Sequence, residues 1–155
     1  MLREWGWPGA TAGARAAAGK KEDGVPMPKR ILIVDDDTSI ATLLTEALGM
    51  EGYETVTVTQ DLRFFDAVKE HQPDLVVLDM MMPYLDGKDE LTLLHLDPEI
   101  PGMPVIIYTA FPNAQQQQAE LRQLGVVEII DKATGLEKLT AAIKRTIGEP
   151  QGVAR

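Results

Sequence analysis

Short apolar segments alternate with amphipathic segments through residues 29–147, and this alternation constrains the fold more than any other feature of the sequence. Each apolar segment is four or five residues long, which is typical of a buried strand. Strands are expected at 30–34, 54–58, 75–78, 104–108 and 126–130. Strands that alternate with helices in this way predict a parallel sheet with helices on both faces, an α/β fold.

The segments between these strands carry the 3.6-residue period of amphipathic helices. Asp61 and Thr134 are residue types that cap helix N-termini. Leu62, Phe65 and Val68 are expected to face the core. Helices are therefore expected from Asp37 to Gly49 or Gly52, from Asp61 to about His71, over 88–96, from Pro112 to Leu124, and from Thr134 to Gly148.

The two ends of the chain lack this pattern. Residues 1–28 hold no lasting helical or strand period, and we expect a disordered N-terminal extension there, a single domain over 29–147 and a C-terminal tail over 148–155. Met27, directly before the first strand, is a second candidate start of translation. Residues 1–28 lack the apolar centre of a signal peptide, which favours a cytoplasmic protein.

Charge and composition limit the classes of partner and of binding site that this chain can have. The net charge is −9, and residues 31–155 carry nine basic and 21 acidic side chains, which argues against direct nucleic-acid binding. Cysteine is absent from the sequence, which excludes disulfides and thiolate metal sites. The apolar runs are far too short to cross a membrane, so no membrane contact is expected.

Polar residues stand at the ends of four of the expected strands. Asp35 and Asp36 follow the first strand, Asp79 the third, Thr109 the fourth and Lys132 the fifth. The carboxyl ends of parallel strands share one edge of an open sheet, and ligands bind beyond that edge. These side chains are therefore expected to converge.

Three carboxylates in one small pocket repel one another, and a hard cation relieves that repulsion. Mg²⁺ prefers oxygen ligands and keeps sites for water and phosphate, so Asp35, Asp36 and Asp79 predict a magnesium site. Asp79 is the natural nucleophile, because a carboxylate can form an aspartyl-phosphate. Lys132 and Thr109 can contact phosphoryl oxygens.

Each of these residues alone has a simpler interpretation, because Asp after a strand is common as a turn or helix-cap residue. Asp37 is itself interpreted as a helix cap or a solvated residue. Their joint occurrence, in order and each at the end of an apolar strand, favours the functional interpretation.

At this point the sequence resembles the receiver domain of bacterial response regulators, the two-component signalling family. The resemblance covers about residues 29–147 and is specific. It is carried by Ile31-Leu32-Ile33-Val34-Asp35-Asp36-Asp37, by the segment from Pro73-Asp74-Leu75 through Asp79-Met80-Met81-Met82-Pro83 to Asp86-Gly87, and by Pro104-Val105-Ile106-Ile107-Tyr108-Thr109-Ala110.

The resemblance implies a flavodoxin-like, doubly wound sheet of five strands in the order 2-1-3-4-5 with five helices. It implies that Asp79 is the phospho-acceptor, that Asp36 binds Mg²⁺ directly and Asp35 through water, and that the backbone carbonyl of Met81 is a further ligand. Thr109 and Lys132 match the family's switch hydroxyl and phosphate-binding lysine. Pro83 and Gly87 match residues that shape the loop after the acceptor.

The resemblance also implies a signalling protein of a phosphorelay, which catalyses only its own phosphorylation and dephosphorylation and is otherwise no enzyme. Its expected partners are a sensor histidine kinase or a histidine phosphotransferase, and a downstream protein that contacts about residues 112–147.

Two departures from the family keep an alternative open. Ala133 follows Lys132 where the family usually has proline, and Ile129 stands where it usually has an aromatic residue. They motivate a receiver-like binding module that works without phosphorylation. A hydrolase with an aspartyl-phosphate intermediate is a third hypothesis, disfavoured because Met81 replaces the second acid that such enzymes commonly use.

Overall fold

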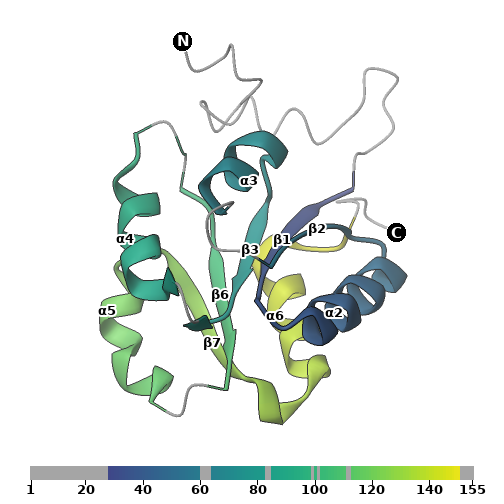
Figure 1. Ribbon diagram of the computed structural model, residues 1–155. Helices are drawn as coiled ribbons and strands as arrows, with labels where there is room; N and C mark the ends of the chain where they lie inside the picture. The colour runs from purple at the N-terminus through teal and green to yellow at the C-terminus, as the bar shows by residue number, and fades with distance from the viewer. Residues whose placement is uncertain are drawn as a thin grey trace.

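The computed structural model describes residues 28–59, 64–82, 85–98, 100, 102–110 and 113–150. Its main sheet has five parallel strands in the order β2-β1-β3-β6-β7, which confirms the expected fold class and strand order (Figure 1). These strands are β1 (Arg30–Val34), β2 (Glu54–Val58), β3 (Leu75–Leu78), β6 (Val105–Thr109) and β7 (Val126–Asp131).

A second, two-stranded antiparallel ladder interrupts the segment after β3. It pairs β4 (Met81–Met82) with β5 (Leu85–Asp86). The sequence predicts only a loop here, because two residues per strand are too few to leave an alternating pattern.

Helices cover both faces of the main sheet (Figure 1). Cluster contacts place α2 and α6 on one face, and α3, α4 and α5 on the other. The helices are α2 (Thr38–Glu51), α3 (Phe64–His71), α4 (Gly87–Leu96), α5 (Gln118–Arg122) and α6 (Leu136–Ile147), with 3₁₀ turns at η4 (Ala114–Gln117) and η5 (Lys132–Thr134).

Helix α2 begins and ends as its sequence indicates. The Asp37 side chain accepts hydrogen bonds from the backbone N–H groups of Ser39 and Ile40, which confirms Asp37 as a helix cap. Of the two candidate glycines, Gly52 ends the helix, with a φ of 107° that favours glycine, while Gly49 lies inside it.

The helix expected from Pro112 to Leu124 is broken into η4 and the short α5. The glutamine-rich stretch supplies no apolar stripe, and Asn113 makes no side-chain cap hydrogen bond, so nothing local favours a regular helix from its start. Pro112 itself lies outside the described residues.

The predicted cap at Thr134 is wrong. Helix α6 starts after Gly135, whose φ is 94° and which gives no side-chain cap, while Thr134 closes the preceding turn η5. The predicted cap Asp61 lies outside the described residues. Leu62 also lies outside the described residues. In α3, Val68 is buried and Phe65 is partly buried against the same core layer, as expected, while Phe64, which was not predicted, is the fully buried ring.

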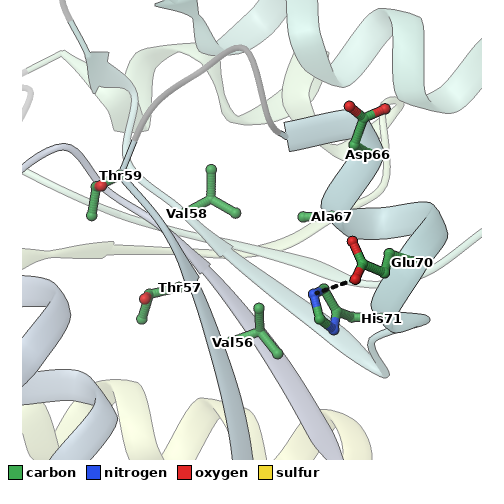
Figure 2. A pocket seen from close by; sticks show the side chains of 8 residues that line it. All are labelled: Val56, Thr57, Val58, Thr59, Asp66, Ala67, Glu70 and His71. Atoms are coloured by element: carbon green, nitrogen blue, oxygen red, sulfur yellow. Dashed lines mark ion pairs between the residues drawn. The ribbon is translucent and has the colours of Figure 1, made fainter.

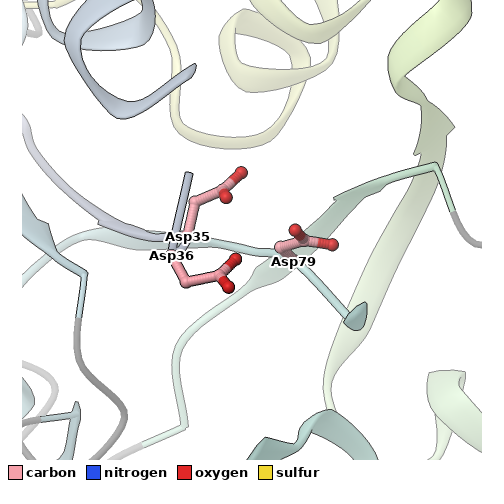
Figure 3. Close-up of side chains that lie close together, drawn as sticks. All are labelled: Asp35, Asp36 and Asp79. Carbon is pink, nitrogen blue, oxygen red and sulfur yellow. The ribbon is translucent and has the colours of Figure 1, made fainter. Parts of the chain in front are cut away.

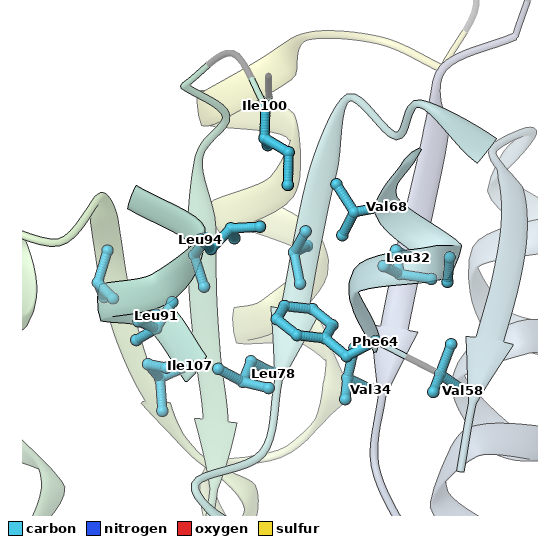
Figure 4. Packing of buried hydrophobic residues seen from close by; sticks show 14 of the residues in the cluster. Leu32, Val34, Val58, Phe64, Val68, Leu78, Leu91, Leu94, Ile100 and Ile107 are labelled. Atoms are coloured by element: carbon cyan, nitrogen blue, oxygen red, sulfur yellow. The ribbon is translucent and has the colours of Figure 1, made fainter. Parts of the chain in front are cut away.

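The core consists of two layers, one on each face of the sheet. Alternate residues of β1 point to opposite layers: Leu32 and Val34 pack under α3, while Ile31 and Ile33 pack under α2 and α6. Phe64 lies among the aliphatic side chains of the first layer (Figure 4). Strand β1 is buried on both faces and serves as a rigid base for the residues that follow it.

A bulge in β7 changes which of its side chains face which layer. The register with β6 shifts between the pairs Val105–Val126 and Ile106–Glu128. Val126 and Ile129, three residues apart, consequently pack on the same layer, whereas Ile130 packs on the other. Strict alternation would have placed Val126 and Ile129 on opposite faces.

The amino-terminal edge of the sheet is closed by residues after α6. The Tyr53 hydroxyl donates a 2.8 Å hydrogen bond to the Gly148 carbonyl, and Lys29 N–H donates to the carbonyl of Pro150, a buried residue. Residues 148–150 thus pack on the domain. Among the described residues, no helix combines the length and apolar character that crossing a membrane requires.

Candidate functional site

The candidate site lies at the carboxyl edge of the main sheet, where the backbone holds two aspartates in place. Asp35 N–H donates to Val58 O at 3.1 Å, and Asp79 N–H donates to Val34 O at 3.0 Å. Both residues therefore continue the hydrogen bonding of the strands they follow. Because β1 and β3 are neighbours, the two side chains emerge next to each other.

Three carboxylates meet at this edge. Asp35, Asp36 and Asp79 each offer an oxygen, and these oxygens lie within 4.8 Å of one another (Figure 3). Asp35 and Asp79 are 2% and 5% exposed, whereas Asp36 is exposed. The group is buried on the sheet side and open to solvent beside Asp36. Within the described part of the chain, no other group of three His, Cys, Asp or Glu side chains is close enough to share a metal ion.

Lys132 reaches across the end of β6 to two of these carboxylates. Its Nζ lies 2.8 Å from Asp35 Oδ2 and 3.0 Å from Asp79 Oδ2. Burial by itself would lower the pKa of Lys132, but the hydrogen bonds to Asp35 and Asp79 outweigh it, and the pKa lies above its ordinary value. The lysine therefore remains charged at neutral pH.

The pKa of Asp35 lies above its ordinary value. Burial raises its pKa, and the nearby Asp79 charge adds to this, while hydrogen bonds from Lys132 and from the backbone of Asp37 act in the opposite direction. The Asp37 N–H donates to Asp35 Oδ1 at 2.9 Å. Additional positive charge at this site would favour the ionised form of Asp35.

Asp79 is held through both carboxylate oxygens. The Thr109 hydroxyl, 1% exposed, donates to Oδ1 at 2.8 Å, and Lys132 donates to Oδ2 at 3.0 Å. The two donors fix the plane of the carboxylate. They also stand where a group attached to Asp79 would have its oxygens, so the arrangement suits the stabilisation of an anion formed on this residue.

Of the other predicted site residues, Met81 and Gly87 are described by the structure and Pro83 is not. The backbone of Met81 begins β4, two residues after Asp79, and pairs with Asp86. A metal contact of the Met81 carbonyl remains a prediction. Pro83 lies outside the described residues, and Gly87 begins α4.

Tyr108, the residue before Thr109 in β6, was not predicted as part of this region. Its side chain is buried in the layer under α2 and α6. Burial raises the pKa of Tyr108; the Lys132 charge acts in the opposite direction, and the Asp35 charge adds to the rise. The signal available in the sequence was an aromatic residue next to Thr109, at the end of an aliphatic strand.

Two hollows lie elsewhere on the surface. One, between β2 and α3, is lined by Thr57, Thr59, Asp66 and His71 among others, and His71 Nε2 is 3.9 Å from Glu70 Oε2 (Figure 2). The other lies between α2 and α6. Neither includes a predicted site residue, so the chemistry of the strand ends is separate from both.

Comparisons with known proteins agree with this arrangement. The family model described as the response regulator receiver domain matches residues 31–144. The chain is 31% identical over 123 residues to the polar-differentiation response regulator DivK of Brucella anthropi, an alignment that covers 79% of this chain and 99% of DivK. It is 35% identical to sporulation initiation phosphotransferase F of Bacillus subtilis, covering 77% of this chain and 94% of that protein.

A solved structure with the same fold carries a ligand. It is the response regulator protein TrrA from Thermotoga maritima in complex with Mg²⁺-BeF, which superposes with a TM-score of 0.66 at 28% identity and covers 77% of this chain and 99% of TrrA.

Proposed function

The chain belongs to the response regulator receiver domain family, and on that premise we propose that it accepts a phosphoryl group on Asp79. The single observation that carries the proposal is the environment of this carboxylate. Thr109 and Lys132 donate to its two oxygens, and oxygens of Asp35 and Asp36 lie within 4.8 Å. The family consists of signalling proteins, and we propose that self-phosphorylation and dephosphorylation are the only reactions that this chain catalyses.

Asp35, Asp36, Asp79 and the backbone carbonyl of Met81 are the residues we propose to hold Mg²⁺. The donor set fits this ion, because three carboxylates offer only oxygen and the exposed side by Asp36 leaves space for water. One Asp35 oxygen is already paired with Lys132, which favours contact through water for Asp35 and direct contact for Asp36. Bound Mg²⁺ would neutralise charge that develops on the phosphoryl oxygens.

The proposed reaction is a displacement at phosphorus. An oxygen of the Asp79 carboxylate attacks the phosphorus of a phosphodonor and forms the new P–O bond. The bond between phosphorus and the donor's leaving atom breaks, and its electron pair departs with the leaving group. Lys132 Nζ and Thr109 Oγ1 transfer their hydrogen bonds from Asp79 to the phosphoryl oxygens and stabilise the negative charge that arrives.

The donor in the cell is proposed to be a sensor histidine kinase or a histidine phosphotransferase, as membership of the receiver domain family implies. We further propose that the protein is cytoplasmic. Its output is proposed to be contact of another protein with about residues 112–147. The acidic body of the chain favours a basic partner surface over nucleic acid.

A binding module that works without phosphorylation is the alternative, and Ala133 and Ile129 are the observations that favour it. Against it stands Lys132, whose Nζ reaches both Asp35 and Asp79 although no proline follows it.

The test is incubation with Mg²⁺ and acetyl phosphate, followed by intact mass spectrometry. We expect a gain of one phosphoryl group in the wild type and none in Asp79→Asn. Asp66→Asn makes the same chemical change on α3, away from the site, and should label like the wild type. Labelling of Asp79→Asn at the wild-type rate would refute the acceptor assignment, and an unlabelled wild type would favour the alternative.

A further inference from the structure

Lys132 is the first residue beyond the sheet. The last residue pair between β6 and β7 joins Thr109 to Asp131, and Lys132 begins the turn η5. Because the strand ladder ends at Asp131, it does not fix the backbone of Lys132. The direction in which the lysine side chain leaves the backbone is therefore set by the geometry of the turn.

Asp131 organises this turn through two contacts. Its Oδ1 accepts a 2.8 Å hydrogen bond from the backbone N–H of Ala133, and its backbone carbonyl accepts a 2.7 Å hydrogen bond from the Thr134 hydroxyl. Both hydrogen bonds join Asp131, the residue before Lys132, to residues that follow Lys132. The first of them needs an N–H at position 133, which proline would lack.

One of the two ion pairs that hold Lys132, the pair with Asp79, changes during the reaction. Before phosphorylation, Asp35 and Asp79 both hold the ammonium group. When Asp79 becomes an acyl phosphate, its carboxylate charge is lost from that position and the lysine must follow the phosphoryl oxygens. During this transfer the backbone turn limits how far Nζ can move away from the reacting group.

We propose that Asp131 is a positioning residue that holds Lys132 in the orientation required for phosphoryl transfer, through its cap on Ala133 and its contact with Thr134. The inference rests on the proposed function of Asp79. Asp131 is exposed, and its hydrogen bonds to Ala133 and Thr134 both lie within the turn, so its proposed effect on Lys132 passes through the turn.

The experiment measures the initial rate of phosphorylation by acetyl phosphate at saturating Mg²⁺, over a range of donor concentrations. Asp131→Ala removes the acceptor and should lower the maximal rate by about fivefold, the rate equivalent of losing a capping hydrogen bond. Asp131→Asn keeps an acceptor of the same shape without the charge and should retain most of the rate. Thr134→Val, which alters no charge, should also slow the reaction.

A double-mutant comparison distinguishes an effect of Asp131 through Lys132 from a purely structural role of Asp131. In a Lys132→Met background, which is slow already, Asp131→Ala should have no further effect, because the residue through which it acts is gone. Thermal melting of each variant ensures that rates are compared for folded protein.

Three results would overturn the inference while leaving the proposed function intact: wild-type rates in both Asp131→Ala and Thr134→Val, an Asp131→Asn rate as low as that of Asp131→Ala, or an undiminished Asp131 effect in the Lys132→Met background. Absence of phosphorylation in the wild type would instead refute the proposed function on which the inference rests.

Discussion

Neutralising Asp36 should stabilise the protein when no divalent cation is present. Asp36→Asn keeps the size and polarity of the side chain and removes one of three negative charges whose oxygens lie within 4.8 Å of one another. Lys132 contacts the other two carboxylates, and no ion pair with Asp36 is found among the described residues. Asp36 therefore contributes repulsion that is only partly balanced, by the Lys132 charge.

The magnitude follows from the separation of the charges. Two unit charges 4.8 Å apart repel by about 1 kcal/mol when screened as in water, the limit suited to an exposed side chain. Asp36 faces two such neighbours, and attraction by the Lys132 ammonium offsets about one of them. A net gain of about 1 kcal/mol in the free energy of unfolding corresponds to a rise in Tm of roughly 4 °C for a domain of this size.

The assay is thermal melting with EDTA and again with saturating Mg²⁺. In EDTA the variant should melt higher than the wild type. Magnesium at ten times its dissociation constant should stabilise the wild type by about 1.4 kcal/mol, and the variant much less, so that the difference shrinks or reverses.

Asp37→Asn is the matched control. It removes the same charge one residue away, and Asn caps a helix about as well as Asp, so its Tm should change little in either condition. A variant Asp36→Asn that melts lower than the wild type in EDTA, or that gains as much from Mg²⁺ as the wild type, would refute the electrostatic reasoning.

Three further outcomes test the fold. Burial, with the charges of Glu149 and Glu51, raises the pKa of Tyr53 to about 12. The stabilisation by the neutral phenol is therefore fully present below about pH 10, the pKa of an unfolded tyrosine, and should be lost as pH rises toward 12. Tyr53→Phe should cost about 1 kcal/mol at neutral pH and should flatten this loss of stability in denaturant titrations. Phe64→Ala should cost about 3–5 kcal/mol in urea unfolding, whereas a cost below 1 kcal/mol would contradict its burial in the core. A chain that starts at Met27 should melt within a few degrees of the full chain and phosphorylate normally, and a large loss of stability would show that residues 1–26 pack on the domain.

Local sequence was sufficient to locate the five strands of the main sheet and to select the polar residues at their ends. The apolar runs that end at Asp35 and Asp79 identified β1 and β3, because a strand buried on both faces leaves an uninterrupted aliphatic segment. The rule that parallel strands share a carboxyl edge then brought Thr109 and Lys132 to the same place, and the structure has them in contact with Asp79. Their roles in phosphoryl transfer remain to be tested by the experiments above.

Only the tertiary structure decided features that depend on contacts between distant segments. The β7 bulge, the hydrogen bond from Tyr53 to Gly148 and the complete burial of Phe64 beside the partly buried Phe65 all depend on the neighbour that each segment meets. Periodicity records how a segment divides between core and solvent, but it does not record register with a partner strand.

The turn after β7 shows the same limit within the site. Thr134 has the sequence character of a cap for the helix that follows it, yet it closes the turn before that helix, and Asp131 caps Ala133 instead. Both residues satisfy cap chemistry equally well in isolation. Asp131 accepts from the Ala133 N–H, whereas the Thr134 hydroxyl donates to the Asp131 carbonyl, and this arrangement follows directly on the last residue pair of β7 with β6, Thr109–Asp131.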